Sequence, residues 1–166
     1  MQNSSPRFLE ILKLLTRYRI DFIVVGGVSA VLHGAPVTTF DLDVVHARNR
    51  ENIARLLSAL DELDAVYRIQ PERLLRPAES HLASPGHQLL LTKFGPLDVR
   101  GMIGKSRTWE DLHASTRTME IEPDVVVRVL DLEMLIVVKE ELGFPKDIAV
   151  LPLLRQALKE RSERQR

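Results

Sequence analysis

The chain of 166 residues carries 23 Lys and Arg against 23 Asp and Glu, so its formal net charge is zero. A neutral chain excludes nucleic-acid binding that depends mainly on an overall positive field, although it leaves room for a local basic patch. The absence of cysteine excludes a disulfide framework, thiolate zinc sites and a cysteine nucleophile, and it fits a reducing compartment. We therefore expect a cytoplasmic protein whose core needs neither metal nor disulfide.

The longest uncharged stretch, residues 22–40, is long enough on paper to span a bilayer. It contains Gly26-Gly27 and Pro36, which favour a buried strand, a turn and a short helix instead. Charged residues run through the first predicted helix, unlike the apolar region of a signal peptide. These features predict a soluble protein with no membrane segment.

Apolar periodicity predicts helices that alternate with strands. The helices are expected at residues 6–18, 28–32, 49–60, 109–114, 132–142 and 147–159. The strands are expected at residues 22–25, 41–45, 66–69, 89–92, 97–100, 118–121 and 125–129. Asn49, Asp131 and Asp147 are the expected helix N-caps, and Gly143 with Pro145 should end the helix before the last.

This pattern predicts an α+β fold with a mixed sheet and flanking helices. We divide the chain into a core at residues 1–130 and a C-terminal helical part at residues 131–160 that packs on the core. The tail at residues 161–166 is entirely polar, so we expect it to fray.

Three carboxylates carry the strongest chemical signal. Asp41 and Asp43 lie two residues apart on a predicted strand, so both project from the same face. Two carboxylates about 4 Å apart repel by roughly 4 kcal/mol at an effective dielectric near 20, and a divalent cation such as Mg²⁺ relieves that repulsion. Asp98 lies between two apolar residues on a later strand. Taken singly, each acid also fits a solvated strand edge or a turn.

A glycine pair, Gly26-Gly27, follows the first buried strand and opens a short helix. Backbone N–H groups at such a point can cradle a phosphate, because no side chain stands in the way. The pair is not followed by Gly-Lys-Ser/Thr and is not part of Gly-x-Gly-x-x-Gly, which excludes the common nucleotide-binding loops. Alone, the pair also fits an ordinary turn.

The order of these motifs resembles the nucleotidyltransferase superfamily typified by DNA polymerase beta. That superfamily places a glycine pair after a buried strand, then an acid-x-acid pair, then a third acid on a later strand. Here 13 residues separate Gly26-Gly27 from Asp41, and Asp98 takes the place of the third acid. Within the superfamily the chain resembles small bacterial proteins of the AbiEii-like toxin and uncharacterised nucleotidyltransferase type, on the segments Val24-Val25-Gly26-Gly27, His33-Gly34 and Thr39-Phe40-Asp41-Leu42-Asp43.

The resemblance extends over residues 21–158. Lys139 and the segment Gly143-Phe144-Pro145-Lys146-Asp147 resemble a helical lysine of the family followed by Gly-Arg-Pro-Lys-Asp. The chain departs from the family at Val37 and Phe144, where relatives usually carry arginine. Without these two guanidinium groups, which could pair with phosphate, we expect weaker binding of a triphosphate.

The resemblance implies a polymerase-beta-type core and a metal-dependent transfer of a nucleoside monophosphate from a nucleoside triphosphate to a hydroxyl acceptor. It assigns Mg²⁺ or Mn²⁺ to Asp41, Asp43 and Asp98, which are also the catalytic residues. It assigns nucleotide contacts to a wider set, namely Gly26, Gly27, Ser29, Lys139 and Asp147.

Three alternatives stay open at this stage. The acceptor can be an RNA end, a protein or a small molecule such as an aminoglycoside. The loss of arginine at Val37 and Phe144 also fits a catalytically degenerate module that kept the fold for binding or regulation. A third hypothesis is a toxin-like protein that pairs with an antitoxin partner.

Overall fold

The computed structural model describes residues 6–166. Its strands are β1 (Phe22–Val25), β2 (Leu42–His46), β3 (Val66–Tyr67), β4 (His87–Thr92), β5 (Gly95–Arg100), β6 (Met102–Ile103), β7 (Arg107–Thr108), β8 (Thr116–Glu122) and β9 (Val125–Leu130). Its helices are α1 (Phe8–Arg17), α2 (Gly26–Leu32), α3 (Arg50–Glu62), α4 (Glu79–Ala83), α5 (Trp109–Leu112), α6 (Leu132–Leu142) and α7 (Pro145–Arg164), with 3-10 turns η1 (Pro71–Arg73) and η2 (His113–Ser115). This arrangement confirms the predicted α+β class.

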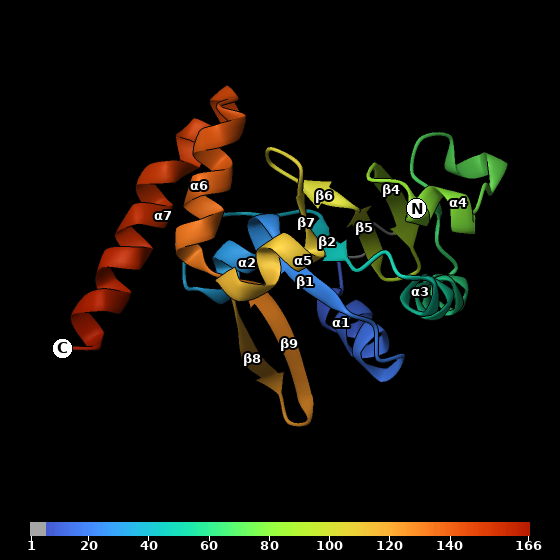
Figure 1. The fold of residues 1–166 in the computed structure, drawn as a ribbon, viewed down its shortest axis with the longest axis horizontal. Coiled ribbons are helices and arrows are strands. Elements are labelled where there is room, and N and C mark those ends of the chain that lie inside the picture. The colour runs from blue at the N-terminus through green and yellow to red at the C-terminus, as the bar shows by residue number, and fades with distance from the viewer. Residues whose placement is uncertain (1–5) are drawn as a thin grey trace.

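Seven strands form one mixed sheet in the order β3-β4-β5-β2-β1-β9-β8. The pairs β2–β5 and β1–β9 are parallel and the other neighbours are antiparallel. The sheet runs through the middle of the molecule, with α6 and α7 at one side and α1 and α3 at the other (Figure 1). In this order β2 is the central strand, and β1 lies next to it.

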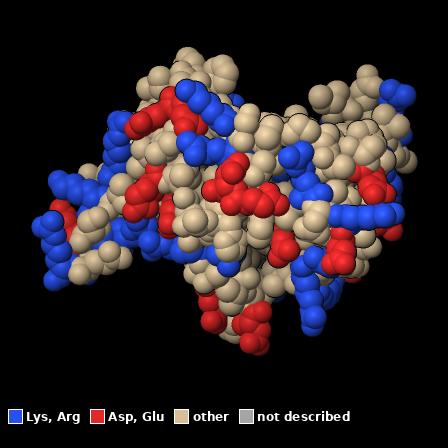
Figure 2. Space-filling view, in the orientation of Figure 1, with Lys and Arg blue, Asp and Glu red and all other residues tan. Residues whose placement is uncertain are grey.

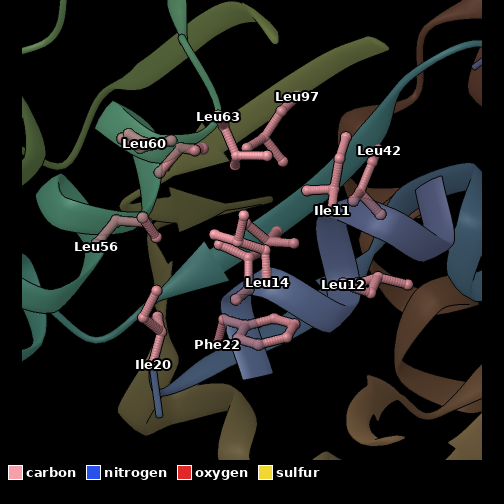
Figure 3. Close-up of a cluster of buried hydrophobic side chains, with 14 of the residues drawn as sticks. Ile11, Leu12, Leu14, Ile20, Phe22, Leu42, Leu56, Leu60, Leu63 and Leu97 are labelled. Carbon is pink, nitrogen blue, oxygen red and sulfur yellow. The ribbon is translucent and has the colours of Figure 1, made fainter. Parts of the chain in front are cut away.

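The two faces of the sheet carry separate apolar clusters, because successive strand residues point to opposite faces. The first cluster packs α1 and α3 against the sheet and includes Ile11, Leu14, Leu56, Leu60 and Leu97 (Figure 3). The second joins the sheet to residues of α6 and α7 such as Leu135 and Leu154. All four residues of β1 are buried, which confirms a strand covered on both faces.

The same alternation decides where the acids point. Leu42 and Val44 of β2 belong to the α1/α3 cluster, so Asp43 between them faces α6 and α7. On β5, Leu97 and Val99 belong to that cluster as well, so Asp98 faces the same way as Asp43. The polar groups of both strands therefore meet on the face that the C-terminal helices cover.

Several predicted boundaries are confirmed and others are corrected. Asn49 caps α3 by accepting a hydrogen bond from the Asn52 backbone N–H at 2.9 Å, and Gly143 ends α6 in the left-handed region at φ +65°. The last helix, however, begins at Pro145, so Asp147 lies inside its first turn and is not the cap. The polar tail, which was expected to fray, is helical through Arg164.

None of the helices that residues 6–166 form has both the length and the apolar character needed to cross a membrane. Lys and Arg are interspersed with Asp and Glu over the face drawn in Figure 2, in keeping with the zero net charge of the whole chain.

Candidate active site

A cleft of about 670 Å³ lies between the sheet and the α6–α7 junction. Asp41, Asp43 and Asp98 line its sheet side, and Gly26-Gly27 open α2 beside them. Lys139 and Asp147 line the side formed by α6 and α7. The volume falls within the range of about 300–1,000 Å³ that small-molecule sites usually have.

Asp43 and Asp98 are direct neighbours across the parallel pair β2–β5. Asp98 is 4% exposed, and Asp41 lies just before β2 at the same cleft. Burial raises the pKa of Asp43 to about 6; the Arg100 guanidinium lowers this pKa and the nearby Asp98 carboxylate raises it. The fold thus keeps two carboxylates together at an electrostatic cost, which is typical of functional sites.

Two arginines compensate the acid pair. Arg100 Nη2 lies 3.0 Å from Asp43 Oδ1 and 3.5 Å from Asp98 Oδ2. Arg68 Nη1 lies 2.9 Å from Asp98 Oδ1 but donates its hydrogen bond to the Leu90 carbonyl at 3.2 Å. Asp98 Oδ1 is consequently buried without a hydrogen-bond donor among residues 6–166. The two guanidinium groups offset the charge of the acid pair, and Asp98 Oδ1 is paired with the Arg68 charge without accepting a hydrogen bond.

His87 fixes the orientation of Arg100. Its Nδ1 accepts a hydrogen bond from Arg100 Nη1 at 2.8 Å, so its Nε2 carries the proton and donates to the Met102 carbonyl at 3.1 Å. Burial and then the Arg100 charge lower the pKa of His87. His87 is therefore neutral near pH 7 and holds the guanidinium over the acids.

The start of α2 is shaped by its two glycines. Gly26 has φ +66°, and a Cβ there would overlap Asp43 Oδ2. A Cβ on Gly27 would stand 2.7 Å from Cβ and Oγ1 of Thr39, whose hydroxyl donates to the Asp41 carbonyl at 3.0 Å. Ser29 is fully buried, and its hydroxyl donates to the Gly26 carbonyl at 2.6 Å. Ser29 therefore stabilises the start of α2 from the protein interior. The two glycines let Thr39 and Asp43 lie close to the backbone of α2.

An ion pair forms the opposite side of the cleft. Lys139 Nζ on α6 lies 2.9 Å from Asp147 Oδ1 on α7. Asp147 is 1% exposed, and its Oδ2 has no hydrogen-bond partner in the described part of the chain. Lys139 and Asp147, eight positions apart in the sequence, thus form an ion pair in the same cleft that the three acids line.

The acids fit a divalent cation by their chemistry. Carboxylate oxygens are the ligands that Mg²⁺ and Mn²⁺ prefer, and the buried Asp98 Oδ1 accepts no hydrogen bond within residues 6–166. Between residues 6 and 166, no three His, Cys, Asp or Glu side chains already form a metal-binding group. A cation shared by Asp43 and Asp98 therefore requires Arg100 to release Asp43.

The raised pKa of Asp43 predicts a pH-dependent stability. An acid whose pKa is higher in the folded state favours folding most when it is protonated, and this advantage falls as the pH rises from about 4 to about 6. A shift from 3.8 to about 6 corresponds to about 3 kcal/mol. We expect the unfolding free energy of the wild type minus that of Asp43→Asn to decrease by about this amount between pH 4 and pH 7. Urea denaturation in EDTA measures it, and a pH-independent difference would contradict the account.

Sequence reasoning missed Arg100 and Arg68 as part of the site. Arg100 follows Asp98 by two residues on one strand, so the strand period could have placed both on the same face. Arg68 directly follows the short strand β3, and only the pairing of β3 with β4 brings it near Asp98. No local signal in the sequence indicates that contact.

Solved structures with a similar fold include a proposed nucleotidyltransferase from Thermotoga maritima and the antibiotic-resistance factor ANT(2″)-Ia. The first shares 18% sequence identity over 92% of this chain and 91% of that chain, with a TM-score of 0.57. The second shares 16% identity over 91% of this chain and 82% of that chain, also with a TM-score of 0.57. No protein-family model matches the sequence, and a search of curated proteins gave no match.

These likenesses show that the chain shares the fold of the two proteins, as the sequence motifs predict. At such low identity they concern the fold alone. The similarity to AbiEii-like toxins, and the antitoxin partner that it implies, stay predictions.

Proposed function

We propose that the protein is a nucleotidyltransferase that moves a nucleoside monophosphate from a nucleoside triphosphate to a hydroxyl acceptor. One observation carries the proposal: the acid pair, the glycine start of α2 and the Lys139–Asp147 ion pair line a single cleft. From Gly26 to Asp147 these elements span more than a hundred residues of the sequence, and together they supply the acids and cations that phosphoryl transfer requires.

In the proposed reaction, the acceptor hydroxyl oxygen attacks the α-phosphorus and pyrophosphate leaves with the electrons of the broken P–O bond. Asp98, buried beside the cleft, orients the hydroxyl and accepts its proton. The first N–H groups of α2, at Gly26 and Gly27, have no acceptor within the helix and bind phosphate oxygens. Lys139, held by Asp147, offsets the negative charge of the triphosphate.

Asp41, Asp43 and Asp98 are the residues that would hold Mg²⁺ or Mn²⁺. A bound divalent cation would neutralise phosphate charge and lower the cost of deprotonating the acceptor. The chain contributes the carboxylates, a glycine that lets Asp43 approach the backbone of α2, and the arginine that pairs with both Asp43 and Asp98.

Arg100 and a divalent cation would compete for the carboxylates of Asp43 and Asp98, so removing the Arg100 charge should strengthen metal binding. Arg100→Gln removes the charge that pairs with Asp43 and Asp98, so we expect the variant to bind Mn²⁺ at least about tenfold more tightly than the wild type. Titration of free Mn²⁺ by electron paramagnetic resonance measures this affinity without any turnover. Arg17→Gln is the matched control, because it breaks an arginine–carboxylate pair with Glu62 away from the cleft. Unchanged or weaker binding by Arg100→Gln would contradict the assigned site.

A screen of acceptors tests the proposed function. The purified protein is incubated with each α-labelled nucleoside triphosphate, Mg²⁺ or Mn²⁺, and a bacterial extract that is afterwards separated into RNA, protein and small molecules. We expect label in one of the three fractions with the wild type and none with Asp43→Asn. Equal labelling by both proteins would contradict the assignment of the acids.

A second candidate is a nucleotide-binding or regulatory module without turnover. The observation that favours it is the pairing of Asp43 and Asp98 with Arg100 and Arg68, which already supply positive charge. This candidate predicts nucleotide binding with no label transferred under any of the conditions above.

A further inference from the structure

One aromatic side chain in the cleft has no part in the chemistry proposed above. Phe144 lines the cleft and is 59% exposed. Among the lining residues, all within residues 6–166, it is the one Phe, Tyr or Trp. Leu142, 40% exposed, lines the cleft next to it in the chain. The α6–α7 side of the cleft therefore combines a flat apolar surface with the charged pair of Lys139 and Asp147.

The backbone that carries this ring is held in place. Gly143, in the left-handed region, ends α6, and the Phe144 carbonyl accepts hydrogen bonds from the N–H groups of Asp147 at 2.9 Å and Ile148 at 3.0 Å. Pro145 restricts the backbone at the first position of α7. An aromatic group on a fixed backbone loses little conformational freedom when it binds a ligand, which favours a binding role.

The neighbours of Phe144 indicate what kind of ligand it suits. Lys139 and Lys146 line the cleft on either side of Phe144 in the chain, and the acid pair lies on the sheet opposite. A ligand that contacts Lys139, Lys146 and Phe144 needs an anionic part near the lysines and a flat apolar part near Phe144. A nucleoside triphosphate has both, with its phosphates at one end and a planar base at the other.

We propose that Phe144 is the platform on which the nucleobase of the nucleoside triphosphate stacks. This inference rests on the proposed function and adds the position of the base to it. Stacking needs only the flat face of the base, so this contact accepts purines and pyrimidines alike.

Calorimetric titration tests the platform by comparing two ligands, Mg²⁺-ATP and Mg²⁺-tripolyphosphate, which lacks the base. In Phe144→Ala we expect the dissociation constant for ATP to rise by a factor of about 5 to 100, and that for tripolyphosphate to stay unchanged. Phe144→Tyr, which keeps the aromatic face, should restore wild-type affinity for ATP. Because the side chain is largely exposed, neither variant should disturb folding.

Each other outcome has a distinct meaning. Equal ATP affinity in the wild type and Phe144→Ala would overturn the platform and leave the proposed transfer intact. Equal weakening for both ligands would overturn it as well, because the effect would then lie in the phosphate site. A wild type that binds neither ligand would overturn the proposed function together with the platform.

Discussion

Asp43→Asn is expected to lower the rate of nucleotidyl transfer by at least about 10³-fold. Asp43 is one of the paired carboxylates at the centre of the cleft, and the cation that these acids would hold contributes several kcal/mol of charge stabilisation to a phosphoryl transition state. Asparagine keeps the size of the side chain and removes its charge. The initial rate of label transfer from an α-labelled nucleoside triphosphate measures the effect.

This variant separates catalysis from folding, because it should be at least as stable as the wild type at pH 7. The raised pKa of Asp43 means that its charge is unfavourable in the folded protein, and asparagine removes that charge. Asp61→Asn is the matched control, since Asp61 is on α3, outside the cleft, with 81% of its side chain exposed. A stable Asp43→Asn protein with wild-type transfer would refute the catalytic assignment.

Gly26→Ala is expected to destabilise the protein and to lower transfer by at least about 10²-fold. A non-glycine residue at φ +66° costs roughly 1–2 kcal/mol, and the added Cβ would overlap Asp43 Oδ2. Asp43 then has to leave its position between Gly26 and Arg100, and a misplaced carboxylate of this kind can cost about 10²-fold in rate. Urea denaturation and the transfer assay measure the two effects.

Gly34→Ala is the matched control for this substitution. Gly34 has φ +89°, so alanine meets a similar backbone penalty there, but a Cβ at Gly34 has no heavy atom within 4 Å. We expect this variant to lose stability and keep its transfer rate. If both variants lost transfer equally, the backbone strain that the two positions share would explain the result, and the contact between Gly26 and Asp43 would not.

The parts of the fold that depend on local pattern were predictable. The continuous apolar run at residues 22–25 predicts a strand that is buried on both faces, and β1 is such a strand. Asp41 and Asp43 both line the cleft, but β2 begins at Leu42, so Asp41 lies just before the strand that was expected to carry both acids. Asn49 and Gly143 mark helix ends through chemistry that acts within a few residues. The residues that the family resemblance assigns to metal and nucleotide all line the cleft except Ser29, although no local signal by itself brings them together.

What could not be predicted depends on contacts between distant segments. The Arg68–Asp98 ion pair exists because β3 adds to β4 at the edge of the sheet. Asp147 looks like a helix cap in the sequence, yet Pro145 starts the helix two residues earlier and Asp147 becomes the buried partner of Lys139. The polar end of α7 is helical where composition alone suggests fraying, and Arg161, which pairs with Glu133 on α6, ties this end to the preceding helix.

Nucleotidyl transfer in this cleft is tested most directly by comparing two labels in one nucleoside triphosphate. The wild-type protein is given the triphosphate labelled at the α-phosphate or at the γ-phosphate, together with Mg²⁺ and the extract. We expect the α label to move to an acceptor and the γ label to be released as pyrophosphate. Transfer of the γ label to an acceptor, or release of the γ label as free phosphate with no α transfer, would contradict nucleotidyl transfer in this cleft.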